Sequence, residues 1–291
     1  MPLTDRPQLL GLALGLIGVL IFSATLPMTH VALAGFSPAF ITFGRAVVAS
    51  TAAIIALTVL RRPLPRGHVG QLFVAGLCVV FGFPGFSSIA MQTIPASHGA
   101  VVLGMLPLLT AIFAALVDGE RPGILFWAYG LLGAALVIAF SIRQNGLHLE
   151  AGDLWLVAAA VTAALGYVLL GRVSRSLSGW EAIAWALVLT LPLSLIGTAI
   201  ALSTGIHGPS AAALGAFAYL GLMSMFSGFI FWNAGLAIGG IGRVAQVQLM
   251  QTFFTFGISA LLLGEHIGME TIAFALLVAA VVWLGRKARH S

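Results

Sequence analysis

Charge is scarce in this sequence, because only 7% of its 291 residues are Asp, Glu, Lys or Arg. An ordinary soluble domain carries roughly 25% charged residues. Long polar stretches are also missing, whereas 60% of the residues are hydrophobic. These absences exclude a water-soluble globular protein and predict that most of the chain lies in a lipid bilayer.

Cysteine and recognisable catalytic motifs are lacking as well. Cys78 is the single cysteine, which excludes an intramolecular disulfide and a cysteine-based zinc site. The chain has no His-Glu-x-x-His pattern, no Ser nucleophile elbow and no Walker loop. We therefore expect neither an enzyme nor an intrinsic ATP motor, and no cofactor or metal. The net charge of +5 does not gather into a basic patch, which argues against a nucleic-acid partner.

Apolar runs of about 20 residues, the length that a helix needs to cross a bilayer, follow one another along the whole chain. Short breaks rich in Gly, Pro and charge separate them. The expected segments are 9–30, 38–60, 69–93, 98–117, 123–142, 153–171, 181–203, 211–235, 242–263 and 268–285. The sequence thus predicts an all-α integral membrane protein with ten transmembrane helices. The first run has some features of a signal peptide, but it is long for one, and we interpret it as a retained span.

The basic residues are distributed unevenly between the two sides of the predicted membrane. With the N-terminus in the cytoplasm, only Arg143 falls in an outer loop and Arg45 lies within the second span. The other eleven are cytoplasmic: Arg6, Arg61, Arg62, Arg66, Arg121, Arg172, Arg175, Arg243, Arg286, Lys287 and Arg289. Because cytoplasmic loops of membrane proteins are enriched in Lys and Arg, both termini are predicted to be cytoplasmic.

The chain also matches itself at a shift of 145 positions. Each half contains a helix that runs into Gly-Glu and then into another helix. The matching residues are Met105, Thr110, Ala115, Leu116, Gly119, Glu120 and Gly123 with Met250, Thr255, Ala260, Leu261, Gly264, Glu265 and Gly268. We therefore predict two five-helix repeats, residues 1–145 and 150–291. An odd number of spans inverts the second repeat, and inverted repeats are a known construction of secondary transporters, with substrate bound between the halves.

At this point a family resemblance becomes visible. Gly152-Asp153-Leu154, followed by small residues, Tyr167 and Arg172, is similar to the start of a repeat in EamA-like members of the drug/metabolite transporter superfamily. Pro107 with Gly119-Glu120, and then Gly264-Glu265, resemble the two repeat ends. The segment from Phe36-Ser37-Pro38 through Phe40 to Arg45 further resembles YddG-type amino-acid exporters. Thr252, which stands where the first half has Pro107, is a departure that leaves the substrate open.

Polar residues inside the predicted spans are candidates for a substrate path, because a polar group in hydrocarbon is costly. The ninth span carries one continuous polar stripe, formed by Gln248, Gln251, Thr252, Thr255 and Ser259. Their helical spacing places them on one face. We interpret the stripe as path-lining; the alternative is that it forms hydrogen bonds between helices.

Arg45 is the one full charge placed clearly inside a span. Three roles are open for it: binding a substrate carboxylate, snorkelling to the outer interface, or pairing with helix carbonyls. Aromatic rings that stack on an apolar substrate or attract an ammonium group complete the candidate lining. These candidates are Phe22 with the adjacent Ser23, Phe86, Tyr167 and Trp185. His98, near the outer end of the fourth span, is expected to be interfacial.

Proline inside a span frees backbone carbonyls and bends the helix. Pro27, Pro84 and Pro107 are therefore candidate hinges. The run from Gly82 to Ser88 is the most interrupted, and we interpret it as a bend or gating point.

The resemblance implies a secondary transporter in the bacterial inner (plasma) membrane that exports small neutral metabolites, most of all aromatic and other neutral amino acids, by alternating access. The expected partners are a small-molecule substrate and the lipid bilayer, and the sequence leaves open whether the protein is a monomer or a homodimer. Two alternatives remain: an exporter of lipophilic drugs within the same superfamily, and an integral membrane enzyme.

Overall fold

The computed structural model describes residues 5–118, 123–144, 150–240 and 244–289. In the first predicted half the helices are α1 (Asp5–Ser23), α2 (Thr25–Leu33), α3 (Pro38–Val59), η1 (Arg66–His68), α4 (Val69–Gly76), η2 (Leu77–Gly82), α5 (Phe83–Ala90), α6 (Ala96–Leu103), α7 (Leu106–Asp118) and α8 (Ile124–Gln144). In the second half they are α9 (Ala151–Val173), α10 (Gly179–Leu202), α11 (Ala211–Ala218), η3 (Tyr219–Ser227), α12 (Gly228–Gly239), η4 (Ala245–Gln248), α14 (Leu249–Leu263) and α15 (Met269–Arg289).

The regular secondary structure of the described residues is helical, and an isolated bridge between Phe36 and Ile206 is its one exception. Seven helical stretches are long and apolar enough to cross a membrane, and three shorter apolar helices accompany them. The predicted all-helical membrane class is therefore confirmed, while the count of ten spans and the orientation stay predictions. The predicted motif residues Gly119 and Glu120 lie outside the described residues.

Local sequence explains where several helices begin. The Phe40 amide donates to Ser37 Oγ (3.2 Å), and Pro38 occupies the first turn, where its missing N–H costs nothing. Ser210 caps α11 in the same way through the Ala213 amide (3.2 Å). At α9, Asp153 in the first turn accepts from the Glu150 amide (3.1 Å).

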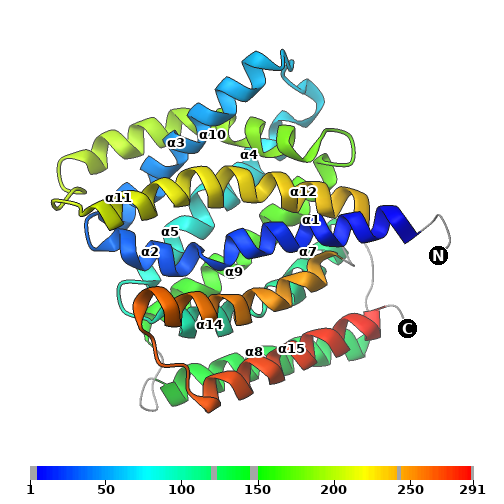
Figure 1. Ribbon diagram of the computed structural model, residues 1–291. Coiled ribbons are helices and arrows are strands. Elements are labelled where there is room, and N and C mark those ends of the chain that lie inside the picture. Colours follow the sequence, from blue (N-terminus) through cyan, green and yellow to red (C-terminus); the bar gives the residue numbers. More distant parts are fainter. Residues whose placement is uncertain (1–4, 119–122, 145–149, 241–243, 290–291) are drawn as a thin grey trace.

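The helices form one bundle in which partners from the two predicted halves lie against one another (Figure 1). Helix α3 packs on α10, α6 on α14, and α8 on α15. Helix α12 packs along α1, and α9 packs on α4 and α5. Helix α1 begins and α15 ends at the same end of the bundle (Figure 1).

Two π-helical segments interrupt the third and eighth predicted spans. The segment η2 ends at Gly82 and η3 ends at Ser227, which are separated by the same 145 residues as the matches in sequence. A π-helix adds a residue to the turn and changes which side chains face a given direction. Both interruptions border the cavity that is described next.

The predicted hinge prolines all lie at helix interruptions or close to them. Pro84 is in the first turn of α5, directly after η2. Pro107 is in the first turn of α7, after the short break that ends α6. Pro27 lies in α2, just after the junction with α1 at Ala24. Whether these positions act as hinges stays a prediction.

Candidate substrate pocket

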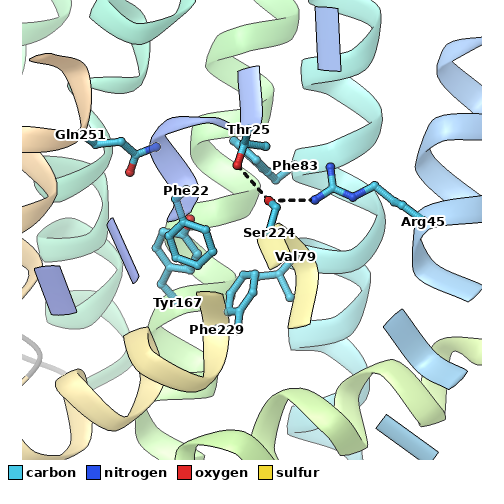
Figure 2. A pocket seen from close by; sticks show the side chains of 9 residues that line it. All are labelled: Phe22, Thr25, Arg45, Val79, Phe83, Tyr167, Ser224, Phe229 and Gln251. Atoms are coloured by element: carbon cyan, nitrogen blue, oxygen red, sulfur yellow. Dashed lines mark hydrogen bonds between the residues drawn. The ribbon is translucent and has the colours of Figure 1, made fainter. Parts of the chain in front are cut away.

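A small enclosed pocket lies in the interior of the bundle. Its lining residues are Phe22, Thr25, Arg45, Val79, Phe83, Tyr167, Ser224, Phe229 and Gln251 (Figure 2). They come from α1, α2, α3, η2, α5, α9, η3, α12 and α14. The cavity volume of about 10 Å³ accommodates roughly one water molecule. A metabolite therefore fits only after the surrounding helices move apart.

Two pairs of lining residues occupy equivalent positions in the two predicted halves. Phe22 and Tyr167 are 145 residues apart, and so are Val79 and Ser224. The rings of Phe22 and Tyr167 also stack on each other, with centroids 6.4 Å apart. Both predicted halves therefore contribute lining residues from equivalent positions of the repeat.

The polar side of the pocket is built around Ser224, which lies in the π-helical segment η3. Arg45 donates from Nη2 to Ser224 Oγ (3.1 Å), and Thr25 Oγ1 shares a hydrogen bond of 2.8 Å with the same oxygen. Figure 2 shows the guanidinium reaching from α3 toward Ser224, with Phe22, Tyr167 and Phe229 on the other side of that serine. Three helical elements therefore meet at one hydroxyl.

Arg45 is only 2% exposed, although it carries a full charge. Its Nε and Nη1 atoms have no hydrogen-bond partner among the described residues, and its bond from Nη2 goes to a side chain and not to a backbone carbonyl. Of the three roles open from sequence, snorkelling and pairing with helix carbonyls are therefore wrong. The structure leaves Arg45 as a buried cation with free donors at the pocket.

The apolar side is a cluster of aromatic rings. Phe22 contacts Phe229 edge-on, with ring centroids 5.0 Å apart, and Tyr167 lies 5.9 Å from Phe229. Trp232, fully buried, lies behind them at 5.7 Å from Tyr167 and 6.3 Å from Phe22. Aromatic rings in such a cluster present both faces and edges to a bound molecule.

The predicted polar stripe of α14 separates into different roles. Gln251 lines the pocket, and its Oε1 has no partner among the described residues. Thr252 donates to the Ala100 carbonyl (3.0 Å) and Thr255 to the Ser23 carbonyl (2.8 Å), which are bonds between helices. Gln248 and Ser259 are buried outside this pocket, and their side-chain polar atoms have no partner in the described part of the chain.

The remaining predicted residues lie elsewhere. Ser23 donates to the Val19 carbonyl of its own helix (2.7 Å). Phe86 stacks on Trp155 with centroids 5.5 Å apart, outside the pocket. Trp185 packs against the hydrophobic core. The structure therefore brings together Phe22, Arg45, Tyr167 and Gln251 from the predicted set.

Sequence reasoning missed Thr25, Ser224, Val79, Phe83 and Phe229 as lining residues. Val79 and Ser224 lie in π-helical segments, where the spacing of an ordinary helix does not apply. The shift of 145 residues relates Phe22 to Tyr167, which were both predicted, and Val79 to Ser224, neither of which the sequence pattern marks. It therefore offered no signal for the missed residues.

A second polar cluster lies at the predicted outer end. His98 Nε2 is 2.7 Å from Asp153 Oδ1, and both side chains are buried. His98 is therefore covered by protein at this end of the bundle, where α9 packs against α6. Its position at the membrane interface stays a prediction. Next to it, both oxygens of Glu265 accept from the amides that open α6, Ala96 (2.8 Å) and Ser97 (2.9 Å).

A wider hollow lies at the same end of the bundle. Its volume is about 650 Å³, and its lining includes His30, Ser37, Gln92, His207 and Ser210. The Phe36–Ile206 bridge, with the Ser37 amide bonded to the Gly205 carbonyl (2.9 Å), ties the loops beside it together.

Known proteins resemble the chain over three quarters of its length or more. "Uncharacterized transporter YdeK" of Bacillus subtilis (strain 168) is 39% identical over 94% of this chain and 96% of the relative. A "probable terminal-alkyne amino-acid exporter" of Streptantibioticus cattleyicolor is 28% identical over 75% of this chain and 74% of the relative. A crystal structure 23% identical in sequence superposes with a TM-score of 0.63, covering 96% of this chain and 95% of the other, which shows a shared fold.

The family comparison agrees with the helical membrane architecture. The model of the EamA-like transporter family matches residues 9–142 and again residues 150–285. These two matches include every residue that lines the pocket. The chain therefore belongs to the EamA-like transporter family of the drug/metabolite transporter superfamily, and it is a multi-pass membrane transporter.

Proposed function

We propose that this protein is a secondary transporter that exports small neutral metabolites, foremost aromatic and other neutral amino acids, across the bacterial inner membrane. The observation that carries the proposal is the enclosed pocket with one cation, two hydroxyls, an amide and a ring cluster. In a zwitterionic amino acid the carboxylate matches the cation and the hydroxyls, and an apolar side chain matches the ring cluster. The transport class is that of the family.

Two inverted five-helix halves, residues 1–145 and 150–291, account for the pairing of the helices. In an inverted repeat, a span can pack against the equivalent span of the other half. Two spans of one half can also each pack against the equivalent of the other. Helix α3 packs on α10 and α8 on α15, which are contacts of the first kind. The contact of α1 with α12 and that of α5 with α9 are a pair of the second kind. The matched residues around the pocket support the same two halves. Ten spans with both termini cytoplasmic are part of this proposal.

Contacts between the two halves at both ends of the bundle support alternating access as the proposed mechanism. At the predicted outer end, Glu265 bonds the first turn of α6. At the predicted cytoplasmic end, Arg62 lies 3.2 Å from Glu181, and Arg172 donates to the Val117 carbonyl (3.2 Å). Each of these joins one half to the other, so opening one end requires those contacts to break while the opposite set holds.

The alternative is an exporter of lipophilic drugs, and the pocket chemistry favours amino acids over those drugs that are cations. Exporters of cationic drugs usually place a carboxylate in the membrane, and none of the described residues that line this pocket is acidic. A cation would instead face the buried guanidinium of Arg45. The relative named as an amino-acid exporter adds support for this substrate class.

Efflux from proteoliposomes tests the proposal. Vesicles that contain the purified protein and labelled phenylalanine, threonine or methionine should lose label faster than protein-free vesicles. Measurements with and without a pH gradient separate facilitated from proton-linked export. Equal rates with and without protein for all three amino acids would refute the amino-acid function.

A further inference from the structure

The described lining of the pocket carries a positive charge without a negative side chain to neutralise it. Arg45 supplies one positive charge, and none of the other lining residues is acidic. Among the described residues, the guanidinium has Ser224 as its one hydrogen-bond partner, with Nε and Nη1 unpaired. An unpaired charge away from water is strongly unfavourable. The pocket therefore favours a ligand that carries one negative charge to Arg45.

The free donors of Arg45 define the chemistry of that ligand. A guanidinium presents a planar fork of N–H groups that matches the two oxygens of a carboxylate. Ser224 and Thr25 lie next to the fork and offer hydroxyl groups to the same carboxylate. A carboxylate with an aromatic or apolar tail would place the tail among Phe22, Tyr167 and Phe229.

The pocket offers an ammonium group fewer favourable partners than it offers a carboxylate. It would lie close to a second positive charge, and its available partners are ring faces, hydroxyls and the Gln251 carbonyl. The zwitterion of an amino acid therefore gains its carboxylate contact at the cost of repulsion between its ammonium and Arg45. The corresponding acid without an ammonium makes the same contact without that repulsion.

We propose that the pocket is a carboxylate site that takes small aromatic monocarboxylate anions at least as well as the zwitterionic amino acids of the same size. This rests on the proposed transport function and extends its substrate class. Arg45 is the residue that determines the requirement for a carboxylate, and the ring cluster receives the apolar tail.

Equilibrium binding to the purified full-length protein in lipid nanodiscs tests this, with ligands that share a phenyl ring. The ligands are 3-phenylpropionate, which has the carboxylate alone, L-phenylalanine, which has both charges, and phenethylamine, which has the ammonium alone. We expect 3-phenylpropionate to bind at least as tightly as phenylalanine, and phenethylamine to bind about tenfold more weakly or worse.

The variant Arg45→Gln should weaken 3-phenylpropionate about tenfold or more and should leave phenethylamine unchanged or improved. The matched control is Arg143→Gln, because Arg143 is an exposed arginine that pairs with Glu270 far from the pocket lining. It should preserve the order of the three ligands. If Arg45→Gln does not fold, the relative affinities of the three ligands for the wild-type protein test the carboxylate site on their own.

Tighter binding of phenethylamine than of 3-phenylpropionate would overturn the carboxylate site, as would unchanged binding of 3-phenylpropionate by folded Arg45→Gln. The outcome is separable from the efflux test. Export of phenylalanine without competition by 3-phenylpropionate refutes this inference and leaves the amino-acid exporter standing. Binding of 3-phenylpropionate that depends on Arg45, without export of any amino acid, supports the carboxylate site and refutes the amino-acid function.

Discussion

Ser224 joins two other polar side chains of the pocket through one oxygen atom. It accepts from Arg45 and shares a hydrogen bond with Thr25, so it connects η3 to α3 and α2. The side chain is 2% exposed. Removing its hydroxyl leaves a buried guanidinium without any described partner, and an unpaired buried polar group is destabilising.

We expect Ser224→Ala to lower the free energy of unfolding by about 1–3 kcal/mol and to slow substrate efflux. Thermal unfolding in detergent and efflux from proteoliposomes measure the two effects. Ser227→Ala is the matched control in the same π-helical segment, because Ser227 donates locally to the Leu222 carbonyl (2.9 Å). Equal behaviour of the two variants would contradict the bridging role of Ser224.

Residue patterns in the sequence predicted part of this pocket. Phe22, Arg45, Tyr167 and Gln251 were predicted and do line it. Thr252 and Thr255 share a helix face with Gln251, yet both bond backbone carbonyls of neighbouring helices. Periodicity identifies a polar face, but the neighbours that meet that face are known only from the packed structure.

At the scale of elements, α1 and α12 cross with their backbones close together. A Cβ atom on Gly11 would lie 2.5 Å from both the Cα and the N of Gly239. These are backbone atoms, so no side-chain rotation relieves the clash. Small residues at such crossings let transmembrane helices approach closely.

Gly11→Ala should therefore push α1 and α12 apart and lower the melting temperature in detergent. The control is Gly215→Ala on α11, where a Cβ meets nothing within 4 Å. In a helix, alanine is favoured over glycine by about 1 kcal/mol, so the control should be neutral or stabilising. A melting temperature of Gly11→Ala at or above that of the wild type would show that the crossing tolerates the methyl group.

Helix α6 begins against a carboxylate from the other predicted half. Glu265 accepts from the amides of Ala96 and Ser97, where the N-terminal end of the helix dipole also favours a negative charge. This contact lies at the predicted outer end and holds α14 to α6.

We expect Glu265→Ala to cost about 0.5–2 kcal/mol of stability and to shift the protein toward an arrangement open at the predicted outer end. A cysteine at Ser97, in a Cys78→Ala background, should then react faster with a maleimide than in the parent with Glu265 intact. Glu270→Ala is the control, because Glu270 pairs with the exposed Arg143. Faster labelling in both variants, or in neither, would argue against a specific closure by Glu265.

For the whole molecule, the sequence predicts how the bundle is oriented in the membrane. The uneven distribution of Lys and Arg predicts cytoplasmic termini. Helix α1 begins and α15 ends at one end of the bundle, as an even number of spans requires (Figure 1).

Cysteine labelling in whole cells tests the orientation, with Cys78→Ala as the parent because Cys78 is the single cysteine. Ser203→Cys should react with a membrane-impermeant maleimide in intact cells. Gly67→Cys should react only after the membrane is permeabilised. Both positions are exposed, so accessibility and not burial decides the result. The reverse labelling pattern would invert the predicted topology.

Composition and apolar periodicity alone determined the class of this protein, because the low charge and the repeated apolar segments of spanning length leave only a helical membrane architecture. The motifs then indicated the EamA-like family, which the family comparison confirmed. The tertiary structure decided the pocket. Two π-helical segments change the direction of Val79 and Ser224, and helix packing determines that Arg45 faces Ser224 and not the membrane surface. Such contacts depend on the rotation of each helix against its neighbours, which a single sequence does not specify.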